Sequence, residues 1–255
     1  MTPTSVDLSV ASFNIRYSRA DDGPDSWPLR KESTAAELAE VVSWDVVGLQ
    51  EALQEQVDYL VGHVPHNAAV SVGRDDGRSD GEHCTVLVDN PDIEVVSSQF
   101  RWLSEDPDVP GSVSWDSSMT RMVTMVRLRH VPSGVRFGFA NAHFDHVGEK
   151  ARIESARLID GWLRDDPHPW IFVGDLNDLP GSPCLQVFAD TGWTSALGAD
   201  AGSTCHSFGG TDHGQIDHIL CTPGITVTDA GIDTSRPGGR FPSDHYAIWA
   251  DVTVG

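Results

Sequence analysis

The segment Trp170–Ser182, which reads WIFVGDLNDLPGS, carries polar side chains directly after an apolar run. Successive side chains of a strand point to opposite faces, so Asp175 and Asn177 share one side. Gly174 has no side chain and therefore permits a close approach of a neighbouring segment. A carboxylate and an amide on one side of a strand end can move a proton or orient a phosphate. A single place of this kind is more often a solvated turn.

The same arrangement recurs at other predicted strand ends. In each, an apolar run meets an acid, an amide or an imidazole, as in ASFNIR, VVGLQE, FGFANAHFDH, GQIDHIL and PSDHYAIW. The polar residues at these strand ends are Asn14, Glu51, Asn141, His143, Asp145, Asp217, Asp244 and His245. Layered α/β folds build their sites where strands end at one edge of a sheet. The repetition therefore favours one shared site over unrelated turns.

Several carboxylates at one edge would repel one another, and their pKa values would rise unless a cation neutralised them. The candidate ligands are all oxygen donors, namely Glu51, Asp175 and Asp244 with the amides of Asn14 and Asn177. Oxygen ligands favour Mg²⁺, Mn²⁺ or Ca²⁺ over Zn²⁺. The sequence therefore predicts a site for a divalent cation.

Two other metal motifs fit the sequence less well. The segment DLNDLPGSPCLQ begins like an EF-hand loop, but it has Leu179 at the fifth position, Pro180 where glycine is needed and Gln186 where glutamate is needed. A zinc site could be drawn from Cys205, His206, His213, His218 and Cys221. Their spacing matches no zinc finger or ribbon, so zinc is the less favoured reading.

The apolar patterns predict many strands and a few helices. Strands are expected over Leu8–Ile15, Val46–Leu49, Thr85–Val88, Glu94–Phe100, Met122–Leu128, Val135–His143, Trp170–Val173, Ile216–Leu220 and Tyr246–Val252. Helices are expected over Pro28–Val42, Leu53–Val61, Glu149–Leu163 and Pro183–Ala189. Two polar stretches rich in glycine and proline, Gly73–Gly81 and Ser104–Ser118, are expected to be long surface loops. This mixture predicts an α/β or α+β layered fold.

Composition limits the partners of the protein. The chain has 255 residues, a net charge of −21 and only two lysines, Lys31 and Lys150. Binding of long duplex DNA or an anionic membrane surface is therefore not expected, because such binding requires Lys and Arg tracks. No apolar run is long enough to cross a membrane and no signal peptide is recognised. The four cysteines form no CxxC, so we expect reduced thiols and a cytoplasmic location.

The ordered motifs SFNIR, GLQE, GEHCTVLV, NAHFD, GDLND, QIDHI and SDHY resemble those of the endonuclease/exonuclease/phosphatase superfamily. They extend from Ser12 to Tyr246, which is nearly the whole chain. The stretches SEDPDVPGSVSWDSSMTR and EKARIESARLI look like a bacterial branch of small metal-dependent hydrolases. The resemblance implies one domain over residues 1–255. It also implies a four-layered α/β sandwich, with two mixed β-sheets face to face and helices outside.

The resemblance also implies roles for single residues. Glu51 would be the principal carboxylate ligand of Mg²⁺ or Mn²⁺, with Asn14 nearby and Asp244 as a candidate second ligand. His143, supported by Glu82, matches the second histidine of the deoxyribonuclease-like and sphingomyelinase-like branches.

The remaining matched residues would handle protons and the phosphate. His245 would bind the phosphate or activate water, with Asp217 holding its ring. Asp175 would be a general base or acid, oriented by Asn177. The resemblance does not fix which of Asp175, His143 and His245 is the base and which the acid.

Three further residues are weaker candidates for substrate binding. Arg121 could hold a phosphate, or it could form a surface salt bridge. Trp115 could stack on a base or sugar, although a tryptophan that anchors its loop is the simpler reading. His206 could lie over the site, although a structural histidine is the simpler reading there too.

Three functions follow from the sequence. The first is a divalent-metal-dependent phosphoesterase that hydrolyses a small ester, such as a nucleotide, a sugar phosphate or a lipid headgroup. The second is a nuclease or deadenylase-like enzyme that grips a short single strand with aromatic and Arg side chains. The third is a phosphate-binding scaffold without catalysis. The sequence leaves open whether the substrate is a monoester or a diester, and it indicates no oligomeric state.

Overall fold

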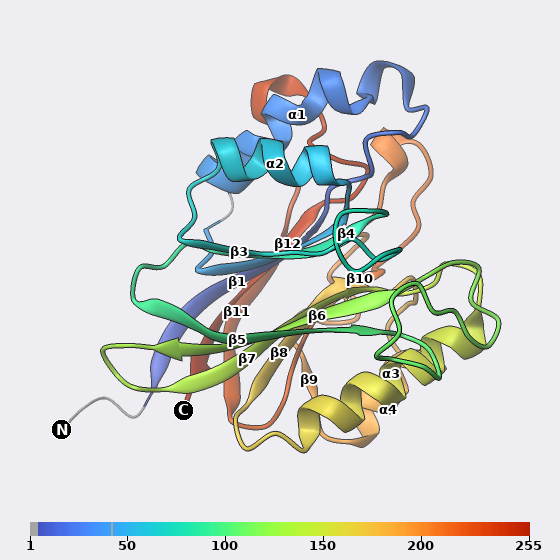
Figure 1. Cartoon of the computed structure of the whole chain (residues 1–255). Coiled ribbons are helices and arrows are strands. Elements are labelled where there is room, and N and C mark those ends of the chain that lie inside the picture. The colour runs from blue at the N-terminus through green and yellow to red at the C-terminus, as the bar shows by residue number, and fades with distance from the viewer. Residues whose placement is uncertain (1–4, 42) are drawn as a thin grey trace.

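The computed structural model describes residues 5–41 and 43–255, and in it the strands form two mixed six-stranded sheets (Figure 1). The strand order of the first sheet is β11 (Ile225–Asp233), β12 (Ala247–Val254), β1 (Val6–Asn14), β2 (Val46–Ala52), β4 (His83–Val88) and β3 (Ala68–Val70). That of the second is β5 (Ile93–Trp102), β6 (Met122–His130), β7 (Arg136–His143), β8 (Trp170–Asp175), β10 (Asp217–Cys221) and β9 (Thr194–Ser195).

Helices cover the outer face of each sheet (Figure 1). Helices α1 (Trp27–Ala36) and α2 (Gln54–His63) lie on the first sheet, where Leu60 packs in one buried cluster with Phe13 and Leu49. Helices α3 (Glu149–Arg164) and α4 (Pro183–Asp190) lie on the second sheet. The predicted four-layered α/β sandwich is therefore confirmed.

The two sheets meet through a central apolar cluster. Strand β7 illustrates the alternation, because Phe137 and Phe139 point into this cluster whereas Ala140 and Ala142 point to the helices. The inner and outer faces of the central strands are both buried, as in sheets with helices on the outside. The inner face therefore carries the side chains that reach the rim between the sheets.

The predicted strands all exist, but three further strands were missed. β3 and β9 are only three and two residues long. β11 is an edge strand, mostly half-buried and with a bulge between Val227 and Asp229, so its side chains show no clean alternation.

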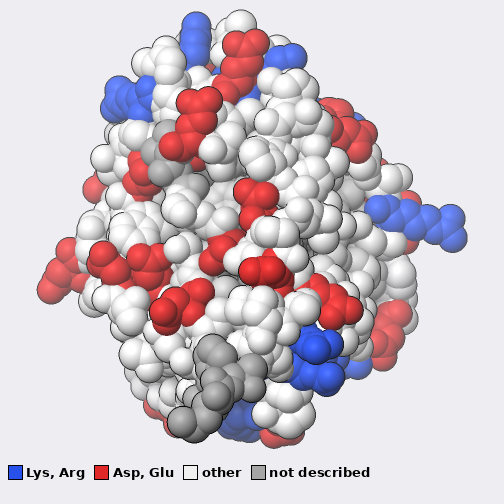
Figure 2. Space-filling view, turned by 90° about the vertical axis from the view of Figure 1, so that its left-hand side faces the viewer, with Lys and Arg blue, Asp and Glu red and all other residues white. Residues whose placement is uncertain are grey.

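The helix predicted over Pro28–Val42 differs from the observed one. The α-helix ends at Ala36 and continues as a π-helix over Glu37–Val41, while Val42 lies outside the described residues. None of the helices in the described residues has the length and apolar composition needed to cross a bilayer. Figure 2 shows acidic side chains across the middle of one face and Lys or Arg scattered away from its centre, so this face offers no continuous basic track.

The π-helix buries an acid that has no role at the rim. Glu37 is 1% exposed and accepts a hydrogen bond from the Ser235 hydroxyl at 2.9 Å, while its other carboxylate oxygen has no partner among the described residues. Burial raises the pKa of Glu37 to about 7. Because the folded pKa exceeds the unfolded value of about 4.3, this group lowers stability as the pH rises between those values.

We predict that Glu37→Gln stabilises the protein at pH 8 by about 1–3 kcal/mol and has little effect at pH 4.5. The amide oxygen of the new side chain can still accept the hydrogen bond from Ser235, so packing is kept. Urea unfolding at both pH values measures the difference. The exposed Glu40→Gln in the same π-helix is the matched control. A stability difference that does not grow with pH would contradict the burial of a costly carboxylate.

Candidate active site

On the inner face of each sheet, several strands end in polar side chains. The polar strand ends of the two sheets meet at one rim. In the second sheet, His143, Asp175 and Asp217 lie side by side in register across β7, β8 and β10. In the first sheet, Asn14 pairs with Gln50 at the ends of the parallel strands β1 and β2. The two sheets therefore bring their strand ends together, as the sequence predicted for this rim.

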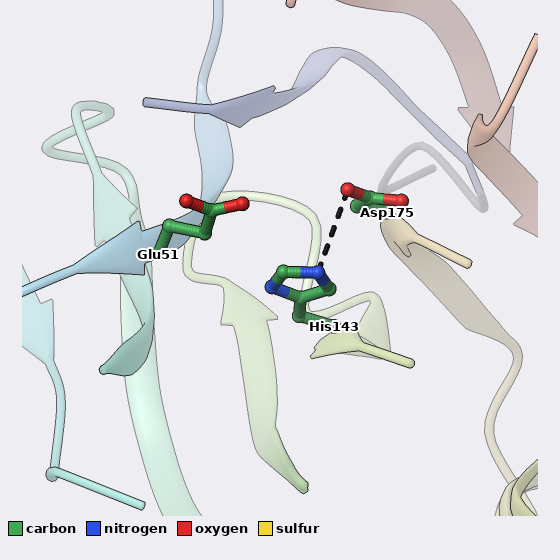
Figure 3. A group of neighbouring side chains, drawn as sticks. All are labelled: Glu51, His143 and Asp175. Carbon is green, nitrogen blue, oxygen red and sulfur yellow. Dashed lines mark ion pairs between the residues drawn. The ribbon is translucent and has the colours of Figure 1, made fainter. Parts of the chain in front are cut away.

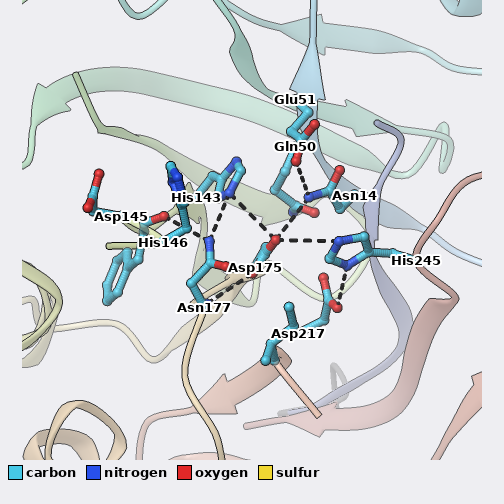
Figure 4. Close-up of polar contacts among 12 residues, drawn as sticks. Asn14, Gln50, Glu51, His143, Asp145, His146, Asp175, Asn177, Asp217 and His245 are labelled. Carbon is cyan, nitrogen blue, oxygen red and sulfur yellow. Dashed lines mark hydrogen bonds and ion pairs between the residues drawn. The ribbon is translucent and has the colours of Figure 1, made fainter. Parts of the chain in front are cut away.

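Asp175 lies at the centre of this group (Figure 4). Its Oδ2 accepts a hydrogen bond from Asn14 Nδ2 at 2.9 Å and lies 3.5 Å from His143 Nε2 and 3.8 Å from His245 Nε2. Burial, followed by the nearby Asp217 charge, raises the pKa of Asp175 to about 7. This carboxyl can therefore exchange a proton near neutral pH.

The backbone around Asp175 is tightly packed. A Cβ at Gly174 would lie 2.0 Å from the carbonyl oxygen of Ala142, so only glycine fits between β7 and β8 there. Asn177 has a φ of 49°, and its backbone N–H donates to Asp175 Oδ1 at 2.9 Å. Its Nδ2 donates to His143 Nε2 at 3.1 Å and to the Phe144 carbonyl at 3.1 Å. Asn177 thus fixes the carboxylate and the imidazole relative to each other.

The two imidazoles of the site carry opposite protonation states. His245 Nδ1 donates to Asp217 Oδ2 at 2.8 Å. Burial opposes its charge, but Asp217 and Asp175 outweigh that effect and raise the pKa of His245 well above its usual value. For His143, burial and the charges of Arg121 and Arg74 lower the pKa well below its usual value. At neutral pH the site therefore contains an imidazolium and a neutral imidazole.

Glu51 reaches the site through an unusual backbone conformation. Its φ is 62°, and the pairing of β2 with β4 is irregular between Leu49 and Ala52. The carboxylate accepts hydrogen bonds from Asn14 Nδ2 at 2.9 Å and from the Tyr17 backbone N–H at 3.1 Å. Strain of this kind at a non-glycine residue is typical of a functional site.

The donor set fits a hard divalent cation. One ligand atom from each of Glu51, His143 and Asp175 lies within 4.8 Å of the others (Figure 3). Asp175 forms a second such group with Asp217 and His245. Carboxylate oxygens predominate in both groups, which favours Mg²⁺ or Mn²⁺ over softer metals.

An internal hydrogen-bond network supports the rim. Its central residue, Gln50, was not predicted from the sequence. Gln50 Nε2 donates to Asn141 Oδ1 at 2.7 Å and to the Ser12 hydroxyl at 3.0 Å. Asn141 Nδ2 in turn donates to the carbonyls of Leu49 and Thr85, so it joins the second sheet to the first. Gln50 could have been found, because alternation along VVGLQE puts it on the inner face.

Arg30 is a second residue that the sequence analysis missed. Its side chain is fully buried and donates to the carbonyls of Ile15, Arg16 and Pro242 at 2.8, 2.8 and 2.9 Å. These carbonyls belong to the segments that follow β1 and precede β12. Arg30 therefore holds together the two segments that carry Asn14 and His245.

The site opens into a cavity of about 710 Å³. Eight of the predicted residues line it, namely Glu51, Glu82, Arg121, His143, Asp175, Asn177, Asp244 and His245. Asn14 and Asp217 lie behind this wall, bonded to Asp175 and His245. The lining also includes Arg16, Arg74 and His146, which were not predicted as site residues, and His213, which was named only for the zinc alternative. Their positions on loops explain this, because no strand alternation reaches them.

A sequence model of the endonuclease/exonuclease/phosphatase family matches residues 11–245. The chain belongs to this family. A search of curated proteins finds no significant match. Among solved structures, a family member from Bacteroides vulgatus is 30% identical with a TM-score of 0.91, and the match covers 98% of this chain and 100% of that chain.

Two further structures extend the comparison. A mannosyl-6-phosphatase from Bacteroides thetaiotaomicron is 28% identical with a TM-score of 0.85, and the match covers 96% of this chain and 99% of that chain. The human nocturnin catalytic domain, 19% identical, shares the fold with a TM-score of 0.75 over 98% of this chain and 96% of that chain. Members of the endonuclease/exonuclease/phosphatase family are metal-dependent hydrolases of phosphate esters, and the chain is a hydrolase of this kind.

The weaker candidates of this family member occupy different environments. Arg121 is 4% exposed and lines the cavity, so it is not part of a surface salt bridge. Its Nε lies 3.7 Å from Asp145, whereas Arg152 contacts only the backbone carbonyl of Asp145. Trp115 is half-buried and is not among the described residues that line the cavity.

His206 also lies outside the cavity lining. Its ring stacks between Phe241 and Tyr246, with ring centroids 4.4 and 4.1 Å away, and its Nδ1 accepts from the Gly209 backbone N–H. Burial lowers the pKa of His206 to about 4, as expected for a packed neutral ring. The zinc reading also lacks support, since His218 donates to the Asp178 carbonyl and Cys221 lies in the central apolar cluster.

We predict that Asp217→Asn lowers the pKa of His245 by several units, because the carboxylate that stabilises the imidazolium is lost. NMR titration of the histidine C–H signals, in the presence of a chelator, measures the change. In the native protein the His245 signal should stay in its protonated position through pH 7, whereas in the variant it should titrate below pH 7. An unchanged titration would show that Asp217 does not hold the proton on His245.

Proposed function

We propose that the protein is a divalent-metal-dependent phosphoesterase that hydrolyses a small phosphate ester by attack of water. One observation carries this proposal. A cavity of about 710 Å³ combines the carboxylate and imidazole cluster with three arginines, Arg16, Arg74 and Arg121, in a chain of net charge −21. The volume suits a ligand of small-molecule size, and clustered guanidinium groups suit an anionic one.

We assign the metal to Glu51, with Asn14 nearby, Asp244 as a candidate second ligand and Mg²⁺ or Mn²⁺ as the ion. The bound ion would polarise a phosphoryl oxygen and stabilise charge as it develops. Asn14 donates to Glu51 and Asp175 through the same amide nitrogen, so its role would be to align the two carboxylates. The oxygen-rich donor set supports this choice of ion.

His245 would bind the phosphate as an imidazolium. Asp217 occupies Nδ1, which leaves the Nε2–H directed toward the cavity near Asp175. A charged donor there stabilises the extra negative charge of the transition state.

Asp175 would accept the proton of the attacking water. Its raised pKa and burial support proton transfer near neutral pH. Asn177 would keep the carboxylate aligned through its backbone N–H. His143, held neutral, would keep its Nε2 facing Asn177 and its Nδ1 facing Glu82, which lies 3.8 Å away.

We further propose a sugar phosphate or a similar small ester as the substrate. The similarity to a mannosyl-6-phosphatase over almost the whole chain supports this class. The net charge of −21 and the presence of only two lysines argue against long duplex DNA. Cleavage of short single strands would instead favour the nuclease alternative.

We also infer the domain organisation and the location of the protein. We propose one domain over residues 1–255, supported by the pairing of β1 with β12. A cytoplasmic location is supported by the four cysteines, which are all free and buried.

We predict hydrolysis of one chromogenic ester from the pair p-nitrophenyl phosphate and bis(p-nitrophenyl) phosphate with Mg²⁺ or Mn²⁺, and none with chelator. His245→Ala and Asp175→Asn should each lower kcat by about 100-fold or more. Near-full activity of either variant would remove that residue from the mechanism. If both esters stay intact while oligonucleotides are cut, the enzyme is a nuclease. If nothing is hydrolysed, the scaffold reading applies.

We predict that Glu51→Gln weakens Mn²⁺ binding by at least about tenfold, because a neutral amide replaces a carboxylate ligand. Calorimetric titration of the metal-free protein measures the affinity. Glu55→Gln, an exposed acid in helix α2, is the matched control and should bind Mn²⁺ as the native protein does. Equal affinities for native protein and Glu51→Gln would exclude Glu51 as a ligand.

A further inference from the structure

One wall of the cavity is built by two long loops that lie against each other. They comprise residues 73–82 and 103–121 and include the polar stretches Gly73–Gly81 and Ser104–Ser118, which the sequence marks as long loops. The Trp102 indole N–H donates to the Arg74 carbonyl, and a Cβ at Gly111 would lie 2.7 Å from the Asp75 carbonyl oxygen. These contacts hold Arg74 and Arg121 on the same wall.

Other residues of the protein use only some of the hydrogen-bond donors of Arg74. Its Nη1 and Nη2 donate to the two carboxylate oxygens of Glu82 at 2.6 and 3.0 Å, and Nη2 also lies 3.1 Å from the Met119 sulfur. Its Nε is buried and lies 4.0 Å from Asp75, and it has no hydrogen-bond partner in the described part of the chain.

Arg121 has fewer hydrogen-bond partners than Arg74. Its Nη2 lies 3.2 Å from His146 Nδ1, but the buried Nε and Nη1 have no hydrogen-bond partner among the described residues. The nearest carboxylate, Asp145, is 3.7 Å from Nε. That carboxylate already accepts four hydrogen bonds, from the hydroxyl and backbone N–H of Ser118 and from two further backbone N–H groups. Buried donors without partners are costly, so these groups are suited to a ligand.

This wall is separate from the reacting groups. His143 stands between them, with its Nε2 3.5 Å from Asp175 and its Nδ1 3.8 Å from Glu82. One imidazole ring and one carboxylate therefore separate Asp175 from Arg74. A phosphate bound at Asp175 and His245 leaves the donors of Arg74 and Arg121 for another part of the same substrate.

We propose that Arg74 and Arg121 bind a second anionic group of the substrate, in addition to the phosphate that is hydrolysed. The substrate class is then a compact, doubly anionic ester, such as a sugar or polyol bisphosphate. Arginine suits this task because its planar fork offers several donors to one phosphate or carboxylate. This inference rests on the proposed function and specifies which small esters the enzyme prefers.

The test measures binding without turnover. Calorimetric titrations with fructose 1,6-bisphosphate and with fructose 6-phosphate, both in chelator, give two dissociation constants for the native protein. The bisphosphate should bind at least about tenfold more tightly, since charge-assisted hydrogen bonds to a second anion are made only by that ligand. Equal dissociation constants, or no detectable binding of either ligand, would overturn the proposal.

Variants identify the residues responsible. Arg121→Gln and Arg74→Gln should each reduce the ratio of the two dissociation constants by about tenfold, and Arg121→Lys should reduce it less because it keeps the charge. Arg129→Gln, on the exposed part of β6, is the matched control and should keep the ratio. Thermal unfolding checks that each variant is folded. If Arg121→Gln and Arg74→Gln weaken both ligands equally, these arginines contact the hydrolysed phosphate or the sugar hydroxyls, and the inference fails.

The outcome is distinguishable from failure of the proposed function. Absence of a bisphosphate preference in the native protein, together with metal-dependent turnover of simple esters, would overturn the inference alone. A bisphosphate preference that depends on both arginines, in a protein that hydrolyses no ester with any metal, would overturn only the catalytic proposal.

Discussion

The hydrogen bond between the Asn14 amide and the Asp175 carboxylate joins the two sheets at the rim. The bond places the Asp175 carboxylate in the buried space between the two sheets. A charge there is unfavourable unless neighbouring groups compensate it. Asn14, Asn177 and the His245 imidazolium supply that compensation. This contact therefore helps to set the acid–base properties of Asp175 at the point where the two sheets meet.

The charge of each histidine in the site is set by the side chains beside it. Asp217 is bonded to His245 and keeps it protonated, so the imidazolium offsets two buried acids at once. His143 sits instead beside two arginines and stays neutral. Two histidines of the same intrinsic basicity thereby acquire different chemistry from their neighbours alone.

The sequence predicted the layered fold and most of the rim residues because the signals are local. Strand alternation identified the faces that carry Asn14, His143 and Asp175, and a glycine signalled a close approach that the structure bears out at Gly174. The residues that were not predicted have roles that depend on contacts between segments far apart in the sequence. The donor function of Arg30 involves backbone carbonyls more than two hundred residues apart, and the unpartnered donors of Arg74 and Arg121 depend on how two loops pack. No pattern along the chain reports such contacts.

The pairing of β1 with β12 has a consequence for how the protein acquires its activity. The first and last strands are neighbours, and Arg30 connects the segments beside them. A contact between chain segments this far apart is slow to form, because a long loop must close first. During synthesis, His245 can join Asp175 only after the chain has been made as far as residue 245. Until that point the imidazole that pairs with Asp217 is absent from the rim.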